Sequence, residues 1–201
     1  MPGAGSPGTF AEVVSHSAPV RYHDLSPRAV EIVAAARALL EEEGLPALSM
    51  RRVAAQLGIQ APALYRHFPD KRELELIIIE QGLWESGDRN LEAIDGADDP
   101  LGAIMASQRD WALEHPHLYR LSYGAHLDRA RIDPDAERHS GEALRRVTGD
   151  DPPVSRAIWA FVHGMIDLML TRRFPPDSDI DAIWQTGVDA LRTRLRSPDR
   201  L

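Results

Sequence analysis

The stretch LSMRRVAAQLGIQAPALYRHFPDKREL, residues 48–74, concentrates positive charge in a chain that is acidic overall. The whole chain has 31 acidic and 23 basic residues and a net charge of −8. Because electric fields act locally, an acidic average does not exclude one basic face. This stretch holds only two acids, and its basic residues are Arg51, Arg52, Arg66, Lys71 and Arg72. The pattern predicts a surface that touches phosphate.

The charge is divided unevenly along the chain. Residues 21–75 contain eight basic and eight acidic residues, so the whole net charge lies outside this segment. There is no cysteine, which suits a reducing cytosol. No apolar run reaches the roughly 18 residues that a membrane-spanning helix needs, and the N-terminus does not read as a signal peptide. We therefore expect a cytoplasmic protein without a membrane partner.

Within the basic stretch, two short helices are predicted on either side of a glycine. Ser49 can cap the first of them, and Gly58 stops it. The second begins near Gln60 or Ala61 and runs to about residue 67, with Pro62 tolerated in its first turn. Two helices joined by a turn of this kind form a helix-turn-helix, whose second helix can enter the major groove of DNA.

The rest of the chain from residue 26 also has helical periodicity, without a clear strand pattern. Capping residues followed by proline recur at Ser26-Pro27, Asp99-Pro100, Asp133-Pro134 and Asp151-Pro152. We predict an all-α fold of about nine helices, a three-helix DNA-binding unit followed by a larger acidic bundle. The expected domains are a flexible N-terminal tail over 1–24, a helix-turn-helix domain over 25–70, and an effector-binding and dimerisation domain over 71–201.

The second short helix presents small side chains that let its backbone approach base edges, and alanine can contact a thymine methyl group. Gln60 is best placed to hydrogen-bond a base, while side chains such as Tyr65 and Lys71 can donate to phosphate oxygens. The alternative is a solvated face over an ordinary three-helix core. The candidate DNA-binding residues are Arg51, Arg52, Gln60, Ala61, Pro62, Ala63, Tyr65, Arg66, His67 and Lys71.

The motif SMRRVAAQLGIQAPALYRHFPDKREL resembles the signature of the tetracycline-repressor (TetR) family of bacterial transcription regulators. The segments WALEHPHLYRLSYG and WAFVHGMIDLMLTRRF resemble the TetR subgroup with a Trp and His-Gly motif in its C-terminal half. The resemblance spans about residues 21–196. It implies base contacts from residues 60–63 and phosphate contacts from Tyr65, His67 and Lys71. Gln60 and Arg52 depart from the family, which often has Ser or Thr and an acid there.

The last two helices are expected to pair with their twins at a two-fold axis, as the resemblance implies. The segment AIWAFVHGMIDLMLTRR is apolar nearly all round and should be buried on most sides. Gly164 and Gly187 indicate close helix crossings. The predicted dimer interface contains Trp159, Gly164, Trp184, Gly187 and Leu191.

A ligand pocket is expected among the middle helices, which supply aromatic, histidine and methionine side chains. Ordinary core packing is the alternative for each of them. The spacing of Glu114-His115-Pro116-His117 does not favour a metal site, and we predict no cofactor and no catalytic residue. The candidate ligand-binding residues are Met105, Trp111, His115, Tyr119, Tyr123, His163, Asp167 and Met169.

These patterns favour a ligand-responsive transcriptional repressor that binds a palindromic DNA operator as a homodimer, with a small-molecule effector. The alternative is a helical interaction or ligand-sensing protein that acts as an activator or binds DNA weakly. An enzyme is disfavoured, because the sequence shows no nucleophile with a base, no phosphate-binding loop and no metal-ligand set.

Overall fold

The computed structural model describes residues 21–124, 129–149 and 151–196, and within these ranges it contains nine α-helices and no strand. The predicted all-α class is therefore confirmed. The helices are α1 (Pro27–Glu43), α2 (Met50–Gln56), α3 (Ala61–Leu64), α4 (Lys71–Ile94), α5 (Pro100–Glu114), α6 (Pro116–Tyr123), α7 (Pro134–Thr148), α8 (Pro152–Leu170) and α9 (Ile180–Arg196).

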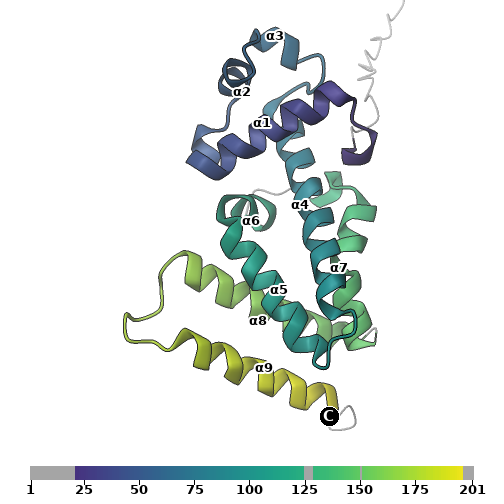
Figure 1. Cartoon of the computed structure of the whole chain (residues 1–201), viewed down its shortest axis with the longest axis vertical. Helices are drawn as coiled ribbons and strands as arrows, with labels where there is room; N and C mark the ends of the chain where they lie inside the picture. Colours follow the sequence, from purple (N-terminus) through teal and green to yellow (C-terminus); the bar gives the residue numbers. More distant parts are fainter. Residues whose placement is uncertain (1–20, 125–128, 150, 197–201) are drawn as a thin grey trace, which may run out of the picture.

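The long helix α4 organises the molecule (Figure 1). The three N-terminal helices lie at its upper end, α7 runs along it, and α5 with α6 lies on its other side. The C-terminal helices α8 and α9 lie at the opposite end of the molecule from α2 and α3. Because α4 packs against α1, α5, α6 and α7, it connects the N-terminal helices to all of the middle helices.

Local capping accounts for several of the helix starts. The Ser26 hydroxyl accepts from the Ala29 N–H at 3.3 Å, and the Asp70 carboxylate accepts from the Glu73 N–H at 2.8 Å. Such a bond satisfies one of the backbone donors that a helix start leaves unpaired. At the start of the last helix, the Asp179 carboxylate accepts from the Ala182 N–H at 2.9 Å.

Two predicted boundaries are corrected. The expected tail over 1–24 falls mostly outside the described residues, but its last four residues are docked on α4. Tyr22–Asp24 form a 3₁₀ turn, and both the Arg21 guanidinium and the Tyr22 N–H donate to Glu80 at 3.1 Å. The third helix ends at Leu64 and not near His67, because the chain turns there to bury Phe68.

Candidate nucleic-acid interface and ligand cavity

The turn between α2 and α3 depends on a glycine. Gly58 has φ +65°, a conformation that side chains with a Cβ rarely adopt. The chain then enters α3, a single turn that is held from below by the buried Leu64 and Phe68. This anchoring fixes the outer side of α3 relative to the core. We call residues 27–71, from α1 to the start of α4, the reading head.

The outer side of α3 combines small side chains with one amide. Gln60 is the N-cap residue of α3, yet its side chain makes no capping hydrogen bond and is exposed. Pro62 is exposed, and Ala61 and Ala63 are half-buried. The predicted base-contacting residues therefore lie together, with a side-chain amide that the helix start does not use.

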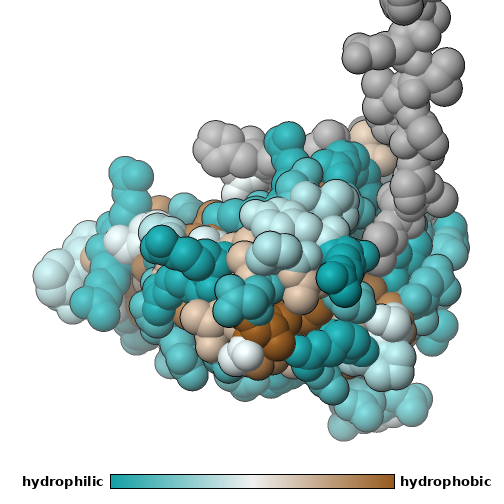
Figure 2. All heavy atoms as spheres, turned by 90° about the horizontal axis from the view of Figure 1, so that it is seen from above, coloured by the Kyte–Doolittle hydropathy of each residue, from teal (hydrophilic) through white to brown (hydrophobic). Residues whose placement is uncertain are grey.

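Cationic and hydroxyl groups surround this side of α3. Arg51 and Arg66 are exposed, Tyr65 is 51% exposed, and His67 is half-buried. Lys71 is half-buried and forms an ion pair with Glu75 at 3.1 Å. Figure 2 looks onto this end of the molecule, where hydrophilic side chains cover most of the face around one smaller hydrophobic area. The arrangement suits phosphate contacts around a close backbone approach.

Arg52 is placed differently from the other cations of the reading head. Its guanidinium donates twice to Glu43 at the end of α1, with one of the two N–O distances 2.9 Å. The side-chain hydrogen bond from Arg52 lowers the pKa of Glu43, and the same bond raises the pKa of Arg52. Arg52 therefore fastens α2 to α1, and a phosphate contact would require it to leave this partner.

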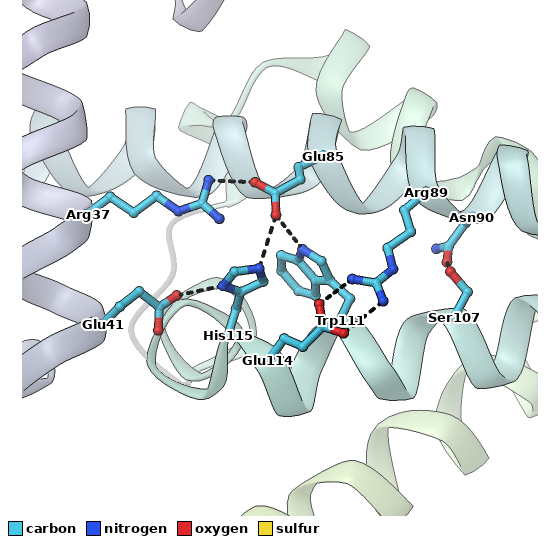
Figure 3. Close-up of polar contacts among 9 residues, drawn as sticks. All are labelled: Arg37, Glu41, Glu85, Arg89, Asn90, Ser107, Trp111, Glu114 and His115. Carbon is cyan, nitrogen blue, oxygen red and sulfur yellow. Dashed lines mark hydrogen bonds and ion pairs between the residues drawn. The ribbon is translucent and has the colours of Figure 1, made fainter.

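A chain of polar side chains connects the reading head to the bundle (Figure 3). Glu85 on α4 accepts from Arg37 of α1 at 2.5 Å and from the Trp111 indole N–H of α5 at 2.9 Å. His115, at the end of α5, lies 3.3 Å from Glu85 and 3.4 Å from Glu41 of α1. We call these five residues the joint. It holds α1, α4 and α5 in one relative position.

Hydrogen bonding decides the charge state at the centre of the joint. Burial raises the pKa of Glu85, but the bonds from Arg37 and Trp111 outweigh it, so the pKa of Glu85 lies below its ordinary value. An ionised Glu85 is thus the form that this geometry favours.

A cavity of about 230 Å³ lies among α4, α5, α7 and α8, with Tyr123 of α6 in its wall. Apolar side chains form much of it, and polar groups from α4, α5 and α7 also face it. Its lining residues are Asn90, Ile104, Met105, Gln108, Tyr123, Glu137, Ser140, Gly141, Leu144, Ile158, Trp159, Val162 and His163. We call it the inner cavity.

A second hollow, of about 530 Å³, lies between α6 and α8. Tyr123, Trp159 and His163 line both hollows, so these three rings form a partition. His163 lies 4.2 Å from Tyr123 and 4.4 Å from Trp159 between ring centroids. The Tyr119 hydroxyl bonds the His163 Nδ1 at 2.6 Å, and burial raises the pKa of Tyr119, which keeps it protonated.

The predicted ligand residues separate into four groups. Met105, Tyr123 and His163 line the inner cavity, whereas Tyr119 and Asp167 line only the second hollow, between α6 and α8. Trp111 and His115 belong to the joint, because their polar atoms point to Glu85. Met169 lines a separate hollow near the α8–α9 turn. The assignment of Trp111, His115 and Met169 to one pocket is therefore corrected.

The residues predicted for the dimer interface also separate. Trp184 is 5% exposed and packs against Phe161 and Arg109 of its own subunit, and Leu191 is half-buried on the core. A Cβ on Gly187 would lie 2.0 Å from the Phe161 ring, so this glycine serves a crossing within the subunit. Trp159 is 46% exposed, and Gly164 is exposed with open space around it. Of the five predicted interface residues, only these two are exposed.

Sequence reasoning missed Arg37, Glu41 and Glu85 of the joint, and the polar side chains of α4, α5 and α7 that line the inner cavity. A signal was present in the helical spacing: Gln108 lies on the same stripe as Ile104, Met105 and Trp111, which are all buried. Asn90 likewise interrupts the apolar face of α4. A polar side chain within an apolar stripe indicates a buried hydrogen-bond network.

The described ranges offer neither a metal site nor a membrane-spanning helix. They contain no group of three or more histidine, aspartate or glutamate side chains that could hold a metal ion. They also contain no helix with the length and apolar character needed to cross a membrane.

Comparisons with known proteins agree with this geometry. Residues 32–76 match the profile of the family "Bacterial regulatory proteins, tetR family", and residues 101–191 match "Tetracyclin repressor-like, C-terminal domain". The second match includes every lining residue of the inner cavity except Asn90, and both segments that carry the subgroup resemblance.

Individual relatives cover less of the chain. A helix-turn-helix-type transcriptional regulator of Mycobacterium bovis is 30% identical over 122 residues, 58% of this chain and 51% of that protein. The class A tetracycline repressor protein from a transposon of Escherichia coli is 34% identical over 101 residues, 50% of this chain and 42% of that protein. The chain thus spans about half the length of the curated relatives it matches.

Solved structures share the fold at lower identity. A protein of unknown function from a Rhodococcus species is 20% identical, with a TM-score of 0.70 over 84% of this chain and 95% of that one. A TetR variant from Acinetobacter baumannii, in complex with minocycline, is 24% identical, with a TM-score of 0.60 over 85% of this chain and 97% of that one.

Proposed function

The chain belongs to the TetR family of bacterial regulatory proteins, and from this premise we propose that it binds double-stranded DNA in the cytoplasm as a transcriptional regulator. The observation that carries the proposal is the outer side of the reading head. There, Gln60 and small side chains lie between exposed cations on an otherwise acidic chain. The family is regulatory, and we propose no catalytic role for any residue.

The regulator acts as a homodimer on a palindromic operator. One reading head covers one half-site, so two-fold symmetry in the protein matches two-fold symmetry in the DNA. The outward side of α8 supports this, since Trp159 and Gly164 are exposed there and a small residue permits close approach of a second helix. This proposed contact is isologous, with the same patch on both subunits.

A small-molecule effector in the inner cavity controls the reading heads, most simply by releasing a repressor from DNA. The cavity is lined by α5, which also carries Trp111 of the joint and is followed directly by His115. A ligand that shifts α5 relative to α4 therefore changes the position of α1. Such a ligand acts by binding one of two arrangements more tightly.

The experiment is a DNA mobility shift against selected random DNA at several salt concentrations. We expect a palindromic consensus and an affinity that falls with salt. In Lys71→Ala the slope of log affinity against log salt should fall by about 1 per subunit, because one phosphate contact is lost. Arg138→Ala, an exposed cation on α7, is the matched control. Absence of any shift at low salt would contradict DNA binding.

The alternative function, a ligand-sensing helical protein that acts as an activator or binds DNA weakly, shares the same cavity. A reporter gene behind the selected operator separates the two. Repression that the effector relieves supports the repressor, and stimulation supports the activator.

A further inference from the structure

A directed chain of hydrogen bonds ends at the inner cavity. The Ser107 hydroxyl donates to the Asn90 side-chain oxygen at 2.8 Å, and the Asn90 side-chain N–H₂ donates to the Gln108 oxygen at 2.9 Å. Asn90 is 3% exposed and Ser107 is 9% exposed, so this series of hydrogen bonds is buried. Its order leaves the Gln108 Nε2 as the last donor.

That last donor is unused. The Gln108 Nε2 is buried and has no hydrogen-bond partner among the described residues, and Gln108 lines the inner cavity. A buried N–H without an acceptor destabilises the fold that holds it. The geometry therefore places an empty donor where a ligand would supply the acceptor.

The charge of the cavity wall restricts the ligand further. Among the described residues, no lysine or arginine lines the inner cavity, and the wall includes the carboxylate of Glu137. An anionic ligand would lose its hydration without gaining a cation. An ammonium group offers donors only, so it cannot supply the acceptor that the Gln108 Nε2 lacks. Both arguments favour an uncharged ligand.

The size and lining of the inner cavity restrict the size and polarity of the ligand. About 230 Å³ lies below the roughly 300–1,000 Å³ of most ligand pockets. Aliphatic side chains from α5, α7 and α8 form much of the wall, and Trp159 presents an aromatic ring to it. This space suits one or two small rings.

We propose that the effector is a small uncharged molecule with an apolar, ring-sized body and one acceptor, such as a carbonyl oxygen, bonded to the Gln108 Nε2. The inference rests on the proposed function, in which the inner cavity receives the effector. It adds the chemical class and the residue that recognises it.

Four probes of similar size test the class by calorimetry on the full chain without DNA. Acetophenone carries the carbonyl, cumene is its apolar counterpart, benzoate is an anion and 1-phenylethylammonium is a cation. Acetophenone should bind tightest, about tenfold above cumene, because the hydrogen bond satisfies a buried donor. Cumene or a charged probe binding tightest would overturn the class, as would no binding of any probe at millimolar concentration.

Two variants test the recognising residue. Gln108→Met keeps the side-chain length and should lose the preference for acetophenone over cumene while still binding cumene. Gln185→Met, on the exposed side of α9, is the matched control and should keep that preference. If Gln108→Met does not fold, as judged by circular dichroism, Glu137→Gln carries the test, because it should strengthen benzoate binding selectively. A preference that survives Gln108→Met overturns the assignment of Gln108, and benzoate binding unchanged in Glu137→Gln overturns the exclusion of anionic ligands by the charge of the wall.

The DNA assay is kept separate so that two failures can be told apart. A protein that shifts DNA but binds no probe retains the proposed regulatory function and loses this ligand class. A protein that shows the acetophenone preference but shifts no DNA retains the ligand class and loses the regulatory function.

Discussion

On the DNA-facing side of the reading head, around α3, the charged side chains face outward, whereas at the joint they lie between α1, α4 and α5. Arg51 and Arg66 are exposed, while the Arg37 side chain is 17% exposed and bonded to Glu85. A side chain whose charge is solvated in the free protein can form an ion pair with a phosphate at little cost in free energy. A charge enclosed among partners instead fixes the elements that carry them. The same residue types thus serve binding in one region and positioning in the other.

The largest effect is expected at the joint. Glu85→Ala leaves the Trp111 N–H and Arg37 without their shared acceptor, and Trp111 is 1% exposed. We expect the free energy of unfolding to fall by roughly 2–3 kcal/mol, below the range for a fully buried pair because Glu85 is partly exposed. Denaturant unfolding measures it.

The matched control is Glu114→Ala. It removes an exposed ion pair with Arg89, which lies one turn after Glu85 on α4. It should leave the unfolding midpoint nearly unchanged. Equal losses in the two variants would show that the joint holds nothing that a surface ion pair does not.

A second effect concerns base choice at the reading head. Gln60→Ala removes an exposed amide that makes no capping bond, so the fold should keep its stability. Preference at one position of each half-site should relax by roughly 1–3 kcal/mol for the favoured base. Competition between operators that differ at single positions measures this. A uniform loss across all operators would instead assign Gln60 a role in shaping the helix.

A third effect compares two glycines of the C-terminal helices. Gly187→Ala forces the Phe161 ring to move, and should lower the free energy of unfolding by about 1–2 kcal/mol. Gly164→Ala meets open space and should raise the stability of the single subunit by up to about 1 kcal/mol through helix propensity.

A measurement of dimer affinity tests whether Gly164 lies in the interface between subunits. If α8 forms the interface, Gly164→Ala should weaken the dimer in sedimentation equilibrium despite its better helix propensity. A dimer of unchanged affinity would place the interface elsewhere.

The same contrast explains how far the sequence could predict the molecule. Signals for helix starts are local in sequence, so α5, α7 and α8 begin at the predicted prolines, with side-chain caps from Asp133 and Asp151 but none from Asp99. The reading head was predictable because its motif is contiguous. The joint was not, since Arg37, Glu85 and Trp111 are distant in sequence and meet only when three helices pack. Periodicity also could not tell which side of α9 faces its own subunit, so Trp184 was assigned outward although it is buried.

The smallest expected effect tests whether a cation that positions helices within the subunit can be made to bind phosphate. Arg52 lies on the reading head, but its guanidinium is hydrogen-bonded to Glu43 and thereby connects α2 to α1. Glu43→Gln weakens this bond and should make Arg52 available to phosphate. The slope of log affinity against log salt should then steepen by up to about 1 per subunit. Glu42→Gln makes the same charge change on an exposed neighbour at the end of α1 and is the control for net charge. If both variants steepen the slope equally, the gain comes from reduced repulsion alone, and Arg52 does not reach the DNA even when it is released.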